Sequence, residues 1–262
     1  MNPARTVTSP SNPLLKEARR VLRQGGLTAD GLLVVETFHL LDEALRSSGS
    51  VRTVVASTAR RAEIDARRLP AAAALIWATP RALDAVSATV TAQGVLAFVE
   101  PPGWGWDDVM RAPALVVVLD GLRDPGNAGT ILRAAEAFGA TGAAFGEGSV
   151  SPYHAKVVRA SAGSLFRLPC LAGIPPSEVR QRLEKSGCAP MVTVPSGGIA
   201  PADAALDRPV ALVIGNEAQG VSASWDGCKR LSVPTAGVES LNAAVAASIV
   251  LYEASRQRAR CS

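Results

Sequence analysis

The stretch LDGLRDPGNAGTILRAAEAFGATG, residues 119–142, predicts a strand end, a glycine-bearing loop and a helix in succession. An apolar run over residues 115–119 leads into the loop, and Gly139 closes the helical pattern. This order is typical of nucleotide-binding folds, in which a phosphate lies at the helix N-terminus. However, neither the G-x-G-x-x-G spacing nor G-x-x-x-x-G-K-[ST] is present. The stretch therefore predicts the local fold of a nucleotide site while arguing against a standard NAD or ATP cradle.

Two polar side chains in this stretch need an explanation. Asn127 lies where the cap or the first turn of the helix is expected, and capping alone would account for it. Arg133 follows six residues later between apolar neighbours, outside the last turn, where the helix dipole would favour a cation. An arginine in that place needs a carboxylate or phosphate partner, or a path to solvent. The stretch thus marks a candidate site without identifying its ligand.

The composition of the 262 residues excludes several classes of protein. Hydrophobic residues make up 48% and charged residues 19%, which predicts a globular chain of one or two domains. The net charge of +4 only weakly suggests a polyanionic partner. The four cysteines have no C-x-x-C spacing and lie far from both histidines, so we expect no metal site and a reducing environment. Because the sequence shows neither a signal peptide nor an apolar run of ~20 residues, we expect a soluble cytoplasmic protein.

The order of the expected elements divides the chain into two α/β units. Residues 1–100 alternate strands and helices, and residues 101–113 form a linker rich in proline, glycine and tryptophan. Residues 114–262 form the second unit, whose strands are apolar throughout, which favours a parallel sheet covered on both faces. In it we expect strands at 114–120, 142–146, 189–195, 209–217 and 228–234, and helices at 128–138, 152–162, 176–186 and 240–258.

A helix is predicted near the N-terminus, over residues 11–24, with Ser11 or Asn12 as its cap. Its apolar residues recur on one face, as in a helix that packs against a sheet. The opposite side carries the basic residues Lys16, Arg19, Arg20 and Arg23. This side is either a solvated helix face or a stripe that contacts phosphates.

The segment ALVIGNEAQGVSASW, residues 211–225, is a second candidate site. Its apolar strand ends abruptly in a Gly-Asn-Glu sequence, and ligands of open α/β sheets lie beyond the carboxyl ends of strands. Gly215 would let a ligand approach the backbone, and Glu217 would stand at the rim. A plain strand-to-turn transition would account for the same residues.

The segment LSVPTAGVESLNAAVAASIVLYEASRQR, residues 231–258, is the third. Ser240 is a natural N-cap for a long helix, and the apolar interior of that helix predicts that it is buried, with a subunit interface as one place for it. A capped core helix would explain Ser240 but leaves Asn242, in the first turn, unexplained.

The three segments together are far more specific than any one of them. D-P-x-N-x-G-x-x-x-R, an apolar strand ending in G-N-E-x-x-G, and V-P-x-x-G-x-x-S-L-N resemble, in order and spacing, the three motifs of the SpoU/TrmH family. Members are S-adenosylmethionine-dependent RNA 2′-O-ribose methyltransferases of the SPOUT superfamily. The resemblance covers residues 114–258 and includes KVVRASAGSLFRLP, residues 156–169. SNPLLKEARR, LLVVETFHLLDEAL and VTAQGVLAFVE resemble the family's ribosomal-protein-like RNA-binding domain, apart from Thr37, where members often have glycine.

The resemblance implies a fold and an assembly. The second unit would be a SPOUT-type parallel sheet with a C-terminal trefoil knot, preceded by a small α/β RNA-binding domain. Members are homodimers in which the active site is completed across the interface. The methyl donor would lie in the knot against residues at the matching positions, which are Thr193, Ile214, Gly215, Leu231, Val233, Pro234 and Leu241.

The resemblance also implies residue roles. The catalytic set would be Asn127, Arg133, Glu217, Ser240 and Asn242. A ribose 2′-hydroxyl would attack the sulfonium methyl group, with Asn127 positioning Arg133. Because a guanidinium group does not lose its proton in proteins, Arg133 is better suited to clamping the neighbouring phosphate than to acting as a base. The candidate RNA contacts are Lys16, Arg19, Arg23 and Arg159.

The two-domain layout favours ribosomal RNA as the substrate, with a transfer RNA methyltransferase as the alternative. A non-catalytic RNA-binding protein on the same scaffold is a rival interpretation, against which the complete set of motif residues argues. A nicotinamide-dependent oxidoreductase is the third, and the missing glycine fingerprint argues against it.

Overall fold

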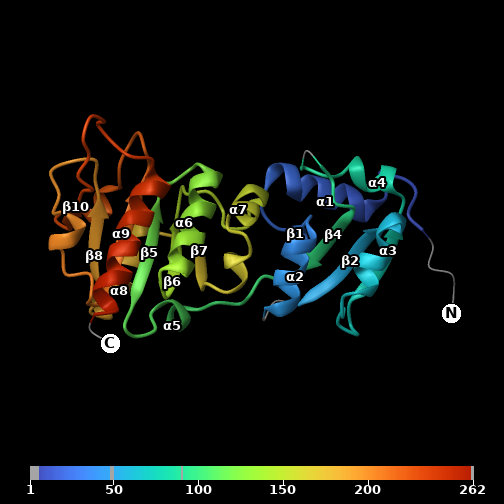
Figure 1. Ribbon diagram of the computed structural model, residues 1–262, viewed down its shortest axis with the longest axis horizontal. Coiled ribbons are helices and arrows are strands. Elements are labelled where there is room, and N and C mark those ends of the chain that lie inside the picture. Colours follow the sequence, from blue (N-terminus) through green and yellow to red (C-terminus); the bar gives the residue numbers. More distant parts are fainter. Residues whose placement is uncertain (1–5, 48–49, 90, 261–262) are drawn as a thin grey trace. The chain divides into compact units, whose positions relative to one another are not determined.

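The computed structural model describes residues 6–47, 50–89 and 91–260. The chain divides into two compact units (Figure 1). The N-terminal unit comprises Met1–Gly103 together with Tyr153–Phe166, and the C-terminal unit comprises Trp104–Pro152 together with Arg167–Ser262. The segment Tyr153–Phe166 therefore packs with the first part of the chain, much of which precedes it by more than a hundred positions.

The N-terminal unit is a mixed sheet with helices packed against it. The strands are β1 (Leu33–Val35), β2 (Val51–Ser57), β3 (Ala74–Ala78) and β4 (Val95–Val99). Their order is β1-β4-β2-β3, in which β4 is antiparallel to both neighbours and β2 is parallel to β3. The helices are α1 (Pro13–Gln24), α2 (Phe38–Arg46), α3 (Arg61–Asp65), α4 (Pro80–Asp84) and α7 (Ala155–Ala160), with short 3₁₀ turns at Thr58–Arg60 (η1) and Ser164–Phe166 (η2).

Helix α1 forms as its sequence predicts. The side chain of Asn12 accepts a hydrogen bond from the amide of Leu14, which confirms Asn12 as the cap, and Pro13 occupies the first turn. Leu15, Ala18, Val21 and Leu22 are buried. They join one apolar cluster with α4, with Ala155 of α7 and with one face of the sheet.

The C-terminal unit contains a six-stranded sheet in the order β10-β8-β9-β5-β6-β7, and every adjacent pair is parallel. The strands are β5 (Leu115–Asp120), β6 (Gly142–Gly146), β7 (Cys170–Ile174), β8 (Ala189–Thr193), β9 (Val210–Gly215) and β10 (Lys229–Leu231). The helices are α5 (Trp106–Val109), α6 (Pro125–Ala137), α8 (Pro176–Lys185) and α9 (Ala243–Arg258), with 3₁₀ turns at Pro201–Asp203 (η3) and Ala223–Trp225 (η4). The predicted parallel α/β sheet is thereby confirmed, whereas the trefoil knot stays a prediction.

Helices cover both faces of this sheet. Val116 and Val118 of β5 belong to an apolar cluster that includes Val179 and Leu183 of α8. Helices α6 and α9 pack side by side, against β6 and β9 respectively (Figure 1). The central strand β5 is buried along its whole length, as the uninterrupted apolar run predicts.

Two helix starts and one strand show how the structure differs from the prediction. Helix α6 begins at Pro125 rather than at 128, because Asp124 caps it. Helix α9 begins at Ala243, so the prediction that Ser240 caps it is wrong and Asn242 is the cap. Strand β7 was not predicted, since its sequence CLAGI is short and contains a glycine; in the structure only its first residue, Cys170, is buried.

Helix α9 is also less buried than its apolar composition predicts. Ala247, Leu251 and Ala254 are buried, but Val245, Ile249 and Tyr252 are 48%, 39% and 57% exposed. These three residues recur at i, i+4 and i+7 and so form one stripe on the helix surface. In the single chain, this apolar stripe faces solvent.

Candidate active site

Three polar side chains, one from each motif, meet at the carboxyl end of the C-terminal sheet. The amide nitrogen Nδ2 of Asn127 donates to Oε1 of Glu217 at 2.6 Å. The amide oxygen Oδ1 of Asn127 accepts from Nδ2 of Asn242 at 2.9 Å. Asn127 thus bridges two residues that lie 90 and 115 positions away in the chain. The structure brings together the three motif residues that the sequence singled out for different reasons.

Local capping explains how two of these side chains are placed. The carboxylate of Asp124 accepts from the backbone amide of Asn127 at 2.6 Å, which fixes Asn127 in the first turn of α6. Oδ1 of Asn242 accepts from the amides of Ala244 and Val245 at the start of α9. Because the cap uses only Oδ1, Nδ2 of Asn242 is left to donate to Asn127. The helix start therefore also sets the orientation of the side chain.

The loop after β9 holds Glu217. Asn216 donates from Nδ2 to the carbonyl of Gly121, which lies in the loop after β5, and its Oδ1 accepts from the amides of Ala218 and Gln219. Strands β5 and β9 are paired in register up to their last residues. The two loops that carry Asn127 and Glu217 are consequently tied to each other at their base.

Gly215 is required by close backbone packing in this loop. A Cβ atom at Gly215 would lie 2.5 Å from the carbonyl carbon and oxygen of Gly220. Gly220 itself has φ of +71°, a left-handed conformation that favours glycine. Asn216 and Gly220 exchange two backbone hydrogen bonds, which close the loop. The G-N-E-x-x-G pattern therefore describes a tight turn that only these glycines permit.

A cavity of about 360 Å³ opens beside the three polar side chains. Its volume falls in the usual range of small-molecule sites. Of the residues predicted from the sequence, it is lined by Thr193, Ile214, Gly215, Glu217, Val233, Ser240 and Leu241. Leu231 is fully buried and Pro234 is exposed, and neither is among the lining residues.

Sequence reasoning missed other lining residues, which are Val194, Pro195, Asn216, Ala218, Gln219, Gly220, Ala243 and Ala246. Each lies within four positions of a residue that was predicted. Reading the whole loop after each strand, rather than its most polar residue, would have found most of them.

The structure does not bring Arg133 to this cluster. Arg133 is exposed, and its side chain makes no hydrogen bond or ion pair with any residue that the structure describes. Six positions separate it from Asn127 on α6, which turns it about 120° away around the helix axis. Its guanidinium group is therefore free for a partner outside the chain.

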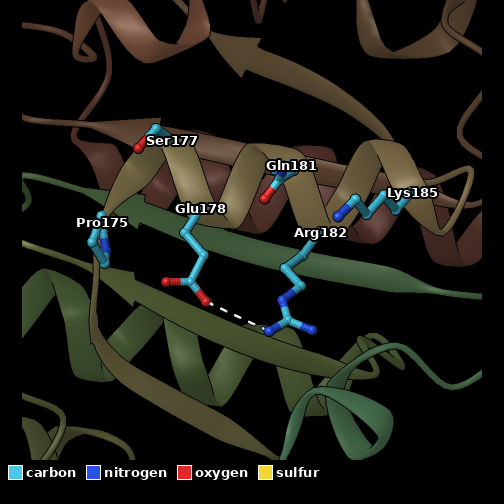
Figure 2. A pocket seen from close by; sticks show the side chains of 6 residues that line it. All are labelled: Pro175, Ser177, Glu178, Gln181, Arg182 and Lys185. Atoms are coloured by element: carbon cyan, nitrogen blue, oxygen red, sulfur yellow. Dashed lines mark ion pairs between the residues drawn. The ribbon is translucent and has the colours of Figure 1, made fainter.

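A larger hollow, of about 740 Å³, lies along α8 and contains none of the motif residues (Figure 2). It is open, and all of its lining side chains come from α8 or from Pro175, which precedes it. Glu178 and Arg182 face each other there at 3.8 Å. The size of this hollow reflects a helix surface with long charged side chains, not a built site.

The predicted RNA contacts fall into two groups. Lys16, Arg19 and Arg23 are exposed on α1, and their side chains have no ion-pair or hydrogen-bond partner among the described residues. Arg159 instead donates to Oε1 of Glu36 at 2.7 Å, and the side chain of Glu36 is only 2% exposed. Arg159 thus neutralises a buried carboxylate within the N-terminal unit.

No three side chains of His, Cys, Asp or Glu gather closely enough to hold a metal ion in the part of the chain that the structure describes. Over the same residues, no helix has both the length and the apolar character that crossing a membrane requires.

Comparison with known proteins supports the motif-based expectation. The sequence profile of the SpoU rRNA Methylase family matches residues 114–252. The chain is 33% identical to an uncharacterized tRNA/rRNA methyltransferase of Synechocystis sp., over 97% of this chain and 94% of that protein. It is 29% identical to the 23S rRNA (guanosine(2553)-2′-O)-methyltransferase RlmP of Bacillus subtilis, over 94% of this chain and 97% of that one.

A solved structure matches the whole fold. The SpoU methyltransferase AviRb from Streptomyces viridochromogenes, in complex with the cofactor AdoMet, superimposes with a TM-score of 0.83 at 31% identity. The match covers 95% of this chain and 98% of AviRb. With the profile spanning the three motifs and the three motif residues joined by hydrogen bonds, this chain belongs to the SpoU rRNA methylase family.

Proposed function

We propose that this protein transfers a methyl group from S-adenosylmethionine to the 2′-hydroxyl of a ribose in ribosomal RNA. The observation that carries the proposal is the convergence of Asn127 and Asn242 on Glu217, which lines a cavity. The 2′-O-methyltransferase activity of RlmP on 23S rRNA, and the AdoMet bound to the SpoU methyltransferase AviRb, support it. A ribosomal RNA substrate would place the reaction in the cytoplasm.

The cavity suits S-adenosylmethionine in shape and chemistry. Ile214, Val233 and Leu241 give it apolar walls for an adenine ring and methionine carbons. Gly215, where a side chain would collide with Gly220, leaves backbone as the wall at that point. Thr193 is held by its hydroxyl, which donates to the carbonyl of Val213. The remaining predicted contacts, Leu231 and Pro234, flank Val233 in the chain.

The cofactor supplies an electrophilic methyl group, and this chain has to present the ribose hydroxyl to it. The Oε1 atom of Glu217 is engaged by Asn127, while Oε2 has no hydrogen bond to a described residue. Oε2 is therefore available to accept from the 2′-hydroxyl and orient it. Asn242 holds Asn127, and Ser240, at the cavity wall, offers a further hydroxyl. Orientation of this kind accounts for much of the rate gain in a displacement reaction.

The role proposed for Arg133 is to clamp the phosphate beside the target ribose. A guanidinium group stays protonated and binds phosphate in a bidentate manner, whereas it does not act as a base. The hydroxyl proton would leave to that phosphate or to water. If Arg133→Lys retains near wild-type turnover, the bidentate clamp is wrong.

We further propose a homodimer that forms through the C-terminal unit. The exposed stripe of Val245, Ile249 and Tyr252 gives α9 an apolar surface that a second copy would cover. Tyr252 also meets Phe138 of α6 edge to face, with ring centroids 5.7 Å apart. Because α6 carries Arg133 and packs beside α9, a dimer through this face brings Arg133 close to the interface. Arg133 would then serve the site of the partner.

The N-terminal unit is proposed to bind the RNA substrate. The domain bounds stay a prediction: residues 1–100 bind the RNA, residues 101–113 are the linker, and residues 114–262 are the methyltransferase domain. The unpaired cations on α1, which are Lys16, Arg19 and Arg23, are the proposed contacts with the RNA backbone.

The test has two steps. Calorimetry with S-adenosylmethionine should show binding to the wild type and weaker binding to Leu241→Asp, which puts a carboxylate into an apolar wall. Mapping of 2′-O-methyl groups in ribosomal RNA, from cells with and without the gene, should then show one or more sites that depend on it. No cofactor binding would favour a non-catalytic RNA-binding protein, and a gene-dependent site found only in transfer RNA would move the substrate class.

A further inference from the structure

The charged residues of the N-terminal unit are sorted between its helices. Helices α1, α4 and α7 carry seven Lys and Arg residues against two acidic ones, whereas η1, α2 and α3 carry three against four. The first three helices share one apolar cluster, to which Ala82 of α4 and Ala155 of α7 belong together with the apolar face of α1. We call these three helices the basic layer.

The cations outside the basic layer differ from those inside it in how many have a partner. Around α2 and α3 the cations are engaged, since Arg46 pairs with Glu43 at 2.8 Å, Arg60 with Glu63 at 2.8 Å and Arg67 with Asp42 at 2.7 Å. Arg61 lies over the ring of Trp77 at 4.2 Å from its centroid. Carboxylates and a ring thus satisfy most of the positive charge outside the basic layer.

In the basic layer most cations are unengaged. Five of them are exposed, and their side chains make no hydrogen bond or ion pair with a described residue: Lys16, Arg19, Arg23, Arg81 and Lys156. The two exceptions have carboxylate partners, because Arg20 is held by Glu17 at 2.7 Å and Arg159 by Glu36 at 2.7 Å. Fixed positive charges without counter-charges are the electrostatic footprint of a polyanion site.

Helix α7 is fastened to α1, which keeps Lys156 in this layer. The ring of His154, the N-cap of α7, lies so close to Gly25 that a Cβ atom there would be 2.5 Å from Cδ2 of the imidazole. Gly25, just after α1, has φ of +85° and is fixed by its own backbone bond to Val21. Burial and the nearby cations lower the pKa of His154, so that its ring is neutral near pH 7. The charge at this junction comes from Lys156.

We infer that the basic layer is the surface that grips the RNA backbone, with Lys156 and Arg81 as contacts beside Lys16, Arg19 and Arg23. Arg159 does not belong to the contacts, because its guanidinium group is committed to the buried carboxylate of Glu36. This inference rests on the proposed function for the identity of the polyanion as ribosomal RNA. It adds a contact from the second half of the sequence to a surface that is otherwise built by the first.

The test is the salt dependence of RNA affinity, measured on the full chain with a protein-free ribosomal RNA transcript. The KCl concentration runs from about 50 to about 300 mM, a range in which the release of counterions from RNA changes the affinity measurably. Each phosphate contact that is removed should lower the slope of log K against log salt by roughly 1. Lys156→Gln should therefore reduce the slope by about 1, and the Arg19→Gln, Arg23→Gln double variant by about 2. Arg68→Gln is the matched control, since Arg68 is an exposed, unpaired cation that follows α3, outside the layer.

Each variant and competitor tests a different part of the inference. An unchanged slope in Lys156→Gln, or an equal loss in Arg68→Gln, would overturn the basic layer. Arg159→Gln should lower the melting temperature and leave the slope unchanged, and a reduced slope with unchanged stability would contradict its exclusion. Equal competition by polyglutamate and by RNA would assign the layer to polyanions in general and reject the RNA grip. Calorimetry with S-adenosylmethionine on the same samples tests the proposed function separately, because none of these substitutions touches the cavity.

Discussion

Replacing Asn127 by aspartate tests the bridge at the centre of the candidate active site. The substitution keeps the size of the side chain and leaves an oxygen that can accept from Nδ2 of Asn242, 2.9 Å away. It removes the donor that holds Glu217 and puts a second carboxylate 2.6 Å from the first. We therefore expect the arrangement around Asn127 to open on the Glu217 side only.

The cost can be estimated from these distances. A hydrogen bond to a charged group contributes about 1.5–3 kcal/mol. Two carboxylates in contact at a solvent-exposed position repel by about 1–2 kcal/mol, with the dielectric constant of water as the guide. Together these give roughly 2.5–5 kcal/mol, which lowers the population of the intact arrangement by at least about 50-fold. Because orientation of the ribose depends on that arrangement, methyl transfer should fall by a similar factor.

The assay is transfer of labelled methyl from S-adenosylmethionine to ribosomal RNA at pH 8 and at pH 6. In Asn127→Asp, the adjacent carboxylates raise one of their pKa values, so part of the activity should return at pH 6, where they can share a proton. Asn127→Ala offers no such recovery and is the control. The Asn127→Asp, Glu217→Gln double variant restores a donor opposite the new carboxylate and should regain activity at pH 8. Wild-type turnover of Asn127→Asp at pH 8, or a double variant as poor as the single one, would refute the bridge.

Three further predictions concern stability and reactivity. The guanidinium group of Arg258 donates to four backbone carbonyls around the starts of β5 and β9, so Arg258→Ala should lower the free energy of unfolding by about 2–4 kcal/mol in urea titrations, and a loss below about 0.5 kcal/mol would show that water replaces it. Hydrogen bonds from Arg256 and Gln257 lower the pKa of Glu253 from 4.5 to about 2, so the contribution of Glu253 to the free energy of unfolding is complete above pH 4.5 and is lost as the pH falls towards 2. Melting temperatures should therefore drop less over this pH window in Glu253→Gln than in the wild type, and parallel curves for the two proteins would contradict the shift. Burial raises the pKa of Cys188 to about 11, so peptide mapping at pH 8 should find its alkylation much slower in the native protein than in urea, and equal rates would show that the thiol is accessible.

The sequence was sufficient for the features that depend on local pattern and on strand-end geometry. The apolar runs predicted a parallel sheet, and ligand sites of such sheets lie where strands end. Asn127 and Glu217 could be placed at that edge because each follows a strand that was recognisable in the sequence. Asn242 was singled out because a cap at Ser240 left it without a purpose. In the structure it is itself the cap, and its amide nitrogen remains to donate to Asn127.

The partners that join distant segments could not be predicted. Glu36 and Arg159 lie 123 positions apart, and no periodicity in either segment indicates the other. The sequence therefore predicted Arg159 to be an exposed cation. In the structure it is the counter-charge of the Glu36 carboxylate, which is 2% exposed. The exposure of the α9 stripe could not be predicted from the sequence for a related reason. An apolar helix in sequence does not reveal whether its own chain or a second copy covers it.

The division of the N-terminal unit across the sequence has a consequence for its synthesis. The ribosome makes the sheet and α1 first, then β5, α6 and β6, and only afterwards the residues of α7. Until then Glu36 has Ser87 and the amide of Ala88 as hydrogen-bond donors but lacks its cation, and the place of Ala155 in the apolar cluster is empty. A buried carboxylate without a counter-charge is costly. The first unit to leave the ribosome therefore completes its core only after a large part of the second has been made, so the nascent chain carries an unfinished domain through the translation of its neighbour.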